Sequence, residues 1–221
     1  MSDKTSDKIE SAPLEFWFEF ASTYSYVAAM RIGDLAARAG IALAWKPFLL
    51  GPIFQAQGWN DSPFNLYPVK GRYMWRDMER LCARHGIAFA KPARFPQRSI
   101  LAARVALALE HEPGYATEGP AFVRAAYRAN FAEGRNIGEH AVVEAALREA
   151  GLAPEHWIAR AETMKDALRA QNERAVQIGL FGAPSFVSGG ELFWGNDRLE
   201  DAIIWHAEAS ARHAQHRRAS P

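Results

Sequence analysis

The spacing of apolar and polar residues predicts a strand followed at once by a helix. Residues 14–20 alternate, with apolar side chains at every second position and Glu15 and Glu19 among those between them. This is the pattern of a half-buried strand. Residues 25–39 then place apolar side chains at helical spacing and end at a glycine, which favours a helix with a left-handed cap. Residues 41–48 are short and apolar, which predicts a parallel strand buried on both faces.

The rest of the chain is helical in pattern until close to its end. Residues 49–68 are rich in Gly, Pro, Asn and Asp, which predicts a long irregular loop of the kind that often carries function. Helices are then expected over 70–85, 99–110, 120–133, 139–150, 154–161 and 164–180. Strand-like sequence returns at 185–187 and 191–194, with Ser188-Gly189-Gly190 as a hairpin turn, and a last helix covers 198–211.

This order, β-α-β, then helices, then β-β-α, predicts an α/β thioredoxin-like fold with a large all-helical insertion. The thioredoxin-like domain would comprise residues 14–58 and 178–211, and the insertion residues 59–177. The polar ends, 1–13 and 212–221, are expected to be disordered. The alternative is an α/β domain followed by a separate helical domain. It leaves the closing hairpin without a sheet to join, and an isolated hairpin is barely stable.

Composition and charge narrow the function classes. The 221 residues include 26 basic and 25 acidic ones, for a net charge of +1, which gives no indication of a nucleic-acid or membrane partner. No signal peptide and no membrane-spanning stretch is evident, so a cytoplasmic protein is expected. The single cysteine, Cys82, excludes an intrachain disulfide and is interpreted as a buried core thiol. The histidines lack metal-ligand spacing, so no metal is expected.

Candidate chemistry begins at Ser22-Thr23-Tyr24-Ser25, where the first strand meets the first helix. Thioredoxin-like redox proteins place C-x-x-C at such a junction. Serines cannot perform dithiol chemistry, but a helix N-terminus favours an anion and lowers the pKa of a thiolate held there. Ser22 can donate a hydrogen bond to such a sulfur. The alternative is that Ser22 or Thr23 is simply a helix N-cap.

Two later segments suit the same edge of a thioredoxin-like sheet. Ala183-Pro184 resembles the X-Pro loop that faces the C-x-x-C site in thioredoxin folds, where the proline is cis and the backbone before it pairs with an extended ligand. The alternative is an ordinary proline at a strand start. Gly195-Asn196-Asp197 lies between the last strand and the last helix. It can cap that helix, and Asp197 can also pair with a ligand amino group.

Together these segments resemble the 2-hydroxychromene-2-carboxylate isomerase family, which shares its fold with kappa-class glutathione transferases and DsbA-type proteins. The resemblance runs from about Leu14 to His206. The matching pieces are Phe16-Trp17-Phe18-Glu19-Phe20-Ala21-Ser22 with Tyr24-Ser25-Tyr26, Pro68-x-Lys70-x-x-Tyr73-Met74-x-x-Asp77, Phe181-Gly182-Ala183-Pro184 and Gly195-Asn196-Asp197-Arg198.

The resemblance implies a site for glutathione as cofactor. Ser22 matches the serine that contacts the glutathione sulfur, and it is the implied catalytic residue. Ala183 and Pro184 match the loop that pairs with the cysteinyl part. The segment from Trp194 through Gly195 and Asn196 to Asp197 matches the part that holds the γ-glutamyl end. Asn65 falls near the family's ligand-binding asparagine, and Asn60 is the alternative for that position.

The same resemblance implies a second substrate and an activity. Phe54 and Phe95 would face that substrate, together with Lys70 and with Thr23, which stands where family members commonly have proline. The implied activity is isomerisation of a conjugated aromatic pyruvate, in aromatic-compound catabolism, by reversible addition of the glutathione thiolate. A kappa-like glutathione transferase and a non-catalytic binding module are the alternatives. Family members are often dimers, so a homodimer is also implied.

Overall fold

The computed structural model describes residues 12–112, 114 and 116–219, and its elements follow the predicted order. The first part of the thioredoxin-like fold contains β1 (Leu14–Phe18), α1 (Thr23–Ala39) and β2 (Leu43–Pro47). Its second part contains β3 (Ser185–Ser188), β4 (Glu191–Trp194), the short 3-10 helix η2 (Asn196–Arg198) and α10 (Leu199–Ala219). The predicted fold class, a thioredoxin-like α/β fold with inserted helices, is confirmed.

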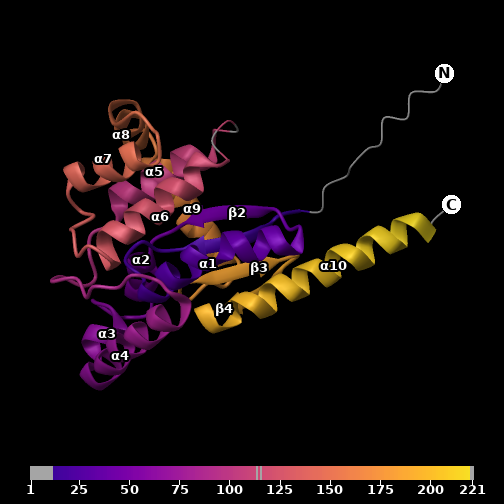
Figure 1. Ribbon diagram of the computed structural model, residues 1–221, viewed down its shortest axis with the longest axis horizontal. Coiled ribbons are helices and arrows are strands. Elements are labelled where there is room, and N and C mark those ends of the chain that lie inside the picture. Colours follow the sequence, from indigo (N-terminus) through magenta and orange to yellow (C-terminus); the bar gives the residue numbers. More distant parts are fainter. Residues whose placement is uncertain (1–11, 113, 115, 220–221) are drawn as a thin grey trace.

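The inserted helices separate these two parts in the sequence. They are α2 (Leu50–Ala56), α3 (Pro63–Leu66), α4 (Pro68–His85), α5 (Ile100–Glu110), α6 (Glu118–Phe131), α7 (His140–Glu149), α8 (Pro154–Glu162) and α9 (Lys165–Gln177). Figure 1 shows α5 to α8 gathered beyond β2, with α3 and α4 in a separate group. The helix α5 packs against β2, and α6 packs against α1.

The four strands form one mixed sheet in the order β2-β1-β3-β4. The strand β1 runs parallel to β2 and antiparallel to β3, with Phe16 opposite Trp45 on one side and Phe186 on the other. The strand β2 is therefore an edge strand, and residues 43–46 are only partly buried. The expected burial of β2 on both faces was wrong, because a strand at a sheet edge has a strand neighbour on one side alone.

Alternation along β1 sends its side chains into two cores. Leu14, Phe16 and Phe18 belong to a large apolar cluster that also contains the buried face of α1. Trp17 lies in a smaller cluster that includes Phe48 of the β2–α2 connection. The larger cluster extends into the inserted helices, where the aromatic rings of the β1–α1 connection meet those of α6. The sheet and the helical insertion thus share the larger of the two cores.

The stretch from residue 49 to residue 68 differs from its prediction, since it contains α2 and α3. The first of these helices has no side-chain cap of its own, and the carboxylate of Glu19 accepts a hydrogen bond from the Leu50 amide, 2.9 Å away. The second begins at Pro63, with the Ser62 hydroxyl as its N-cap. Helices of seven and four residues are too short to show a periodic pattern, and they depend on such contacts for stability.

The last helix is longer than the predicted 198–211. It continues to Ala219, and Figure 1 shows its final turns projecting away from the rest of the chain. Residues 1–11 and 220–221, which fall within the segments predicted to be disordered, lie outside the described residues. In the part that the structure describes, every helix is too short or too polar to cross a membrane.

Candidate functional site

Ser22 occupies the junction between the first strand and the first helix. It is the N-cap of α1, and its Oγ accepts a hydrogen bond from the Ser25 amide at 3.2 Å. The same hydroxyl donates to the Ala183 carbonyl at 3.0 Å. Ser22 therefore has the capping role considered from the sequence, and it also contacts the loop in front of β3. The residue is 8 % exposed, so a ligand must approach it closely to reach the hydroxyl.

The loop beside Ser22 contains the predicted cis proline. The Ala183–Pro184 peptide bond is cis, and the Pro184 carbonyl accepts a hydrogen bond from the Gly195 amide at 2.9 Å. Gly195 has a φ of 110°, in the region that favours glycine, and a Cβ there would lie 2.4 Å from the Asp197 carboxylate. Three segments predicted from separate motifs, at residues 22, 183–184 and 195, are thus linked by hydrogen bonds in the folded protein.

The side chains of Asn196 and Asp197 differ in how accessible they are to a ligand. The Asn196 side chain is buried, and its Oδ1 accepts a hydrogen bond from Arg31 of α1 at 3.2 Å. Arg31 also pairs with Glu200 at the start of α10. Asp197 has a side chain that is 75 % exposed, 3.6 Å from the Arg198 guanidinium. Asn196 therefore fixes the segment to α1, whereas the Asp197 carboxylate is accessible to a cationic group.

Three backbone donors around Ser22 have no hydrogen-bond acceptor in the described part of the chain. They are the amides of Thr23 and Tyr24, in the first turn of α1, and the amide of Ala183. First-turn amides lack partners within their own helix, and the helix dipole adds partial positive charge at the same point. The arrangement favours an anionic or acceptor group between the start of α1 and the Ala183 loop.

A second group of predicted residues lies on α3, α4 and the loop after α4. The Asn65 amide donates to the Phe95 carbonyl at 2.9 Å and to the Asp61 carboxylate at 3.1 Å. The Lys70 ammonium lies 5.7 Å from the centre of the Phe64 ring. That ring in turn lies 6.2 Å from the ring of Tyr24 on α1. Asn65, Lys70 and Phe95 are therefore brought together, and Tyr24 joins them to the Ser22 junction. Asn60, the alternative to Asn65, is exposed.

The remaining two predicted substrate residues are placed differently. Phe54 lies on α2, half-buried against the Trp59 ring at 5.5 Å. Thr23 is 1 % exposed, and its hydroxyl donates to the Met74 sulfur of α4 at 3.3 Å. In this structure Thr23 packs α1 against α4 and presents little surface to a substrate.

Sequence reasoning did not assign Glu19 to the site. Its side chain is buried, and its carboxylate accepts hydrogen bonds from the Ala21 amide, the Leu50 amide and the Ser99 hydroxyl. Burial raises the pKa of Glu19, and these hydrogen bonds oppose the increase. Glu19 thus ties the turn before Ser22 to the starts of α2 and α5. An acid in an alternating strand pattern is normally read as facing solvent, so the sequence alone indicated the opposite environment.

Tyr24 was also missed as a site residue, although it is part of the motif. Its hydroxyl donates to the Asp77 carboxylate of α4 at 3.1 Å. Burial, followed by the negative charge of Asp77, raises the pKa of Tyr24, and Asp197 contributes in the same direction. The phenol therefore stays protonated at neutral pH. Tyr24 lies two residues after Ser22 and contacts both Asp77 and the Phe64 ring, so it connects the two groups of predicted residues.

Cys82 lies in an environment that disfavours its thiolate. Cys82 is buried in the main core, and burial raises the pKa of its thiol to about 11, so it is a poor nucleophile at neutral pH. Within the described residues no group of His, Cys, Asp and Glu side chains is arranged to hold a metal ion.

Comparison with known proteins agrees with this fold. A family model described as a DSBA-like thioredoxin domain matches residues 13–202, so the chain belongs to that family. A 2-hydroxychromene-2-carboxylate isomerase of Sphingobium xenophagum is 29 % identical over 193 residues, covering 85 % of this chain and 94 % of the relative. An isomerase of the same name from Pseudomonas putida is 27 % identical over 190 residues, covering 84 % and 90 %.

A solved structure of a 2-hydroxychromene-2-carboxylate isomerase has the same fold. It superimposes with a TM-score of 0.76 at 23 % identity, over 95 % of this chain and 100 % of that one. The family resemblance predicted from the sequence is confirmed by these matches.

Proposed function

We propose that this protein is a glutathione-dependent isomerase acting on conjugated aromatic pyruvates of the 2-hydroxychromene-2-carboxylate type. Its curated relatives carry the name of that isomerase at modest identity, which supports isomerase activity. The observation that carries the proposal is the pairing of the Ser22 hydroxyl with the Ala183 carbonyl, 3.0 Å apart, at a helix N-terminus that has unpaired amides.

The residues present fit glutathione. The unpaired Ala183 amide can bond the backbone of the cysteinyl part, as a neighbouring strand would. The exposed Asp197 carboxylate can pair with the ammonium group of the γ-glutamyl end. The unpaired amides of Thr23 and Tyr24 can stabilise negative charge near the sulfur.

When bound, glutathione would supply a thiolate that can add to a conjugated alkene and leave again, which permits rotation about the former double bond. The Ser22 hydroxyl has a single proton, and the Ala183 carbonyl accepts it here. A sulfur beside Ser22 would compete for that proton. The N-terminal amides of α1 have no acceptor among the described residues to give up. A sulfur placed beside them is therefore stabilised as a thiolate in preference to a thiol.

The second group of residues is proposed to hold the aromatic acid. Phe95 of this group offers aromatic surface and is half-buried against the Trp75 ring. Phe54, which lies apart on α2 against the Trp59 ring, is proposed to contribute further aromatic surface. The exposed Lys70 ammonium can pair with a substrate carboxylate. Asn65 donates a hydrogen bond to the Phe95 carbonyl, so in this arrangement it positions Phe95.

The test is an isomerisation assay of 2-hydroxychromene-2-carboxylate with and without glutathione, combined with product analysis. The proposal predicts that the rate depends on glutathione and that free thiol is conserved at the end of the reaction. A kappa-like transferase would consume thiol and release a conjugate. Calorimetric titration with glutathione addresses the third case, because no heat of binding at about millimolar concentration would favour a non-catalytic module.

A further inference from the structure

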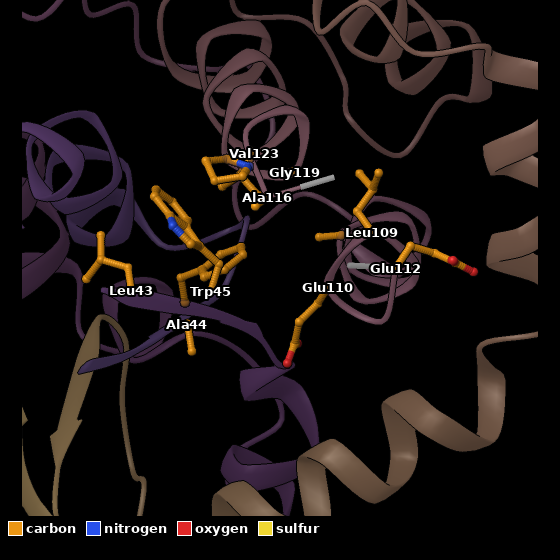
Figure 2. Close-up of a pocket in the computed structure, with 12 residues that line it drawn as sticks. Leu43, Ala44, Trp45, Leu109, Glu110, Glu112, Ala116, Gly119 and Val123 are labelled. Carbon is orange, nitrogen blue, oxygen red and sulfur yellow. The ribbon is translucent and has the colours of Figure 1, made fainter. Parts of the chain in front are cut away.

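Two cavities lie away from the Ser22 junction, and the first has its charges already paired. It measures about 310 Å³ between β2, α5 and α6, and Figure 2 shows Leu43, Trp45, Leu109 and Val123 around it. Glu110 pairs with Lys46, and Glu112 pairs with Arg160 and points away from the hollow. Both acids have partners, so nothing in this cavity indicates a particular ligand.

The second cavity, of about 330 Å³, lies between α2, α5 and α9. Its walls are mainly apolar and are formed by Leu49, Pro52, Ile100, Leu168 and Val176. None of the residues assigned above to glutathione or to the aromatic substrate lines it. Its volume lies within the range of sites for small organic molecules.

Arg104 distinguishes this cavity from the first. The Arg104 Nε atom is buried and has no hydrogen-bond partner, and among the described residues the guanidinium forms no ion pair. A buried donor without an acceptor is costly, and native proteins normally satisfy such groups. Arg104 lines the cavity and is only half-buried, so an anion that enters the cavity can meet a guanidinium that has no ion-pair partner among the described residues.

The other polar groups of the cavity leave a net positive rim. Lys165 lines it and forms no ion pair within the described part of the chain. Arg169 is shared by two acids, 3.3 Å from Asp166 and 3.9 Å from Glu173. The Asn172 amide is held by the backbone of Leu49, to which it donates one hydrogen bond and from which it accepts another. Arg104 and Lys165 thus remain as cations without a partner.

We propose that this cavity is a binding site for a small carboxylic acid with an apolar tail or ring. The carboxylate pairs with Arg104 and Lys165, because an anion that accepts hydrogen bonds complements cationic donors that have no ion-pair partner in the described part of the chain. The hydrocarbon part lies against the apolar wall near Leu168 and removes that surface from water. Binding here requires neither glutathione nor the Ser22 hydroxyl.

Calorimetric titration of the full chain with 3-phenylpropanoate, in the absence of glutathione, tests the proposal. The neutral 3-phenylpropanamide has nearly the same shape and serves as the matched ligand. The acid is expected to bind saturably and at least about tenfold more tightly than the amide, as loss of a charge-assisted pair implies. Neither compound has a conjugated alkene, so neither can be isomerised, and the Arg104 variant separates binding in this cavity from binding at the proposed aromatic-acid site near Lys70.

Variants localise the site. Arg104→Gln is expected to weaken acid binding by about tenfold or more and to leave amide binding unchanged. Glu173→Gln removes a carboxylate from the cavity wall and is expected to strengthen acid binding. Arg76→Gln is the control, because Arg76 lies on α4, outside the cavity.

Three results would each overturn the proposal: no saturable binding of the acid, equal binding of acid and amide, or acid binding that Arg104→Gln does not change. The first of these would indicate a cavity that holds water alone. If circular dichroism shows that Arg104→Gln is unfolded, Glu173→Gln decides the question, because Glu173 lines this cavity. In that case, unchanged acid affinity in Glu173→Gln would count against the site.

Discussion

The hydroxyl of Ser22 donates a hydrogen bond to the carbonyl of Ala183 across 161 positions of sequence, at 3.0 Å. The same oxygen accepts the Ser25 amide and caps α1. One side chain thus closes the start of a helix and joins it to the loop before β3. A substitution at Ser22 changes both the stability of the helix and the chemistry of the site, so experiments must separate the two effects.

Ser22→Ala removes the hydroxyl and the cap together. We expect a loss of about 1 kcal/mol in the free energy of unfolding from the lost cap. We expect a larger loss in activity, on the order of a hundredfold, because the substitution removes a donor to the developing thiolate. Urea denaturation gives the first quantity, and kcat for isomerisation at saturating glutathione gives the second.

Ser22→Gly is the matched variant, because glycine is a good N-cap and costs only a few tenths of a kcal/mol there. It should be nearly as stable as the wild type and as inactive as Ser22→Ala. If activity instead followed stability across the two variants, the hydroxyl would have no role beyond capping.

Glu19 should make stability depend on pH. Burial raises the pKa of Glu19 in the folded protein above the ordinary value of 4.5. At a pH between the unfolded-state pKa and the folded-state pKa, the native state therefore binds more protons than the unfolded state. The free energy of unfolding of the wild type, relative to that of Glu19→Gln, should therefore fall as pH rises through this window. The slope cannot exceed about 1.4 kcal/mol per pH unit for one proton.

Urea denaturation of both proteins from about pH 5 to about pH 8 measures this difference, and subtraction cancels the titration of shared groups. A difference that stays constant or grows with pH would mean that the hydrogen bonds to Glu19 outweigh its burial.

Gly71 allows α3 and α4 to approach closely. A Cβ at Gly71 would lie 2.1 Å from the Phe64 carbonyl oxygen, a backbone atom that cannot move alone. Gly71→Ala should destabilise the fold by about 1–3 kcal/mol and disturb the Asn65 contact with the Phe95 loop. Gly33→Ala in α1 is the control, since its Cβ would have only an ordinary contact at 3.9 Å and alanine favours helix.

Thermal denaturation compares the two glycine variants. Destabilisation by Gly33→Ala equal to that by Gly71→Ala would show that close approach of α3 to α4 is not the cause.

Cys82 should be inert in the native protein. Its thiol is 1 % exposed, and burial raises its pKa to about 11. Ellman's reagent should therefore react slowly with the folded chain and rapidly with the chain in urea. Cys82→Ala should retain activity. Rapid labelling of the native protein, or loss of activity in a folded Cys82→Ala variant, would indicate that this thiol is reactive in the native state.

Much of the fold was predictable because its signals are local. The alternation of β1 and the cap at Ser22 involve residues within four positions of one another. The two helices in the 49–68 stretch were missed because they are too short to show a periodic pattern. The first of them also depends on Glu19, which is 31 positions from Leu50. The site was predicted in part, because hydrogen bonds do link the Ser22, Ala183–Pro184 and Gly195 segments. The Thr23 hydroxyl, in contrast, is bonded to the Met74 sulfur, and Glu19 was not predicted.

The sequence by itself determined the order of elements, the capped start of α1 and the motifs at residues 22, 183–184 and 195–197, since periodicity and capping act over one or two turns. Only the tertiary structure decided that Ser22 reaches Ala183, that Glu19 is buried and that Arg104 has no ion-pair partner among the described residues. Those facts follow from the strand order β2-β1-β3-β4 and from the packing of inserted helices against the sheet. Neither the strand order nor this packing produces a periodic pattern in the sequence, because contacts between distant segments depend on how the elements pack and not on residue spacing.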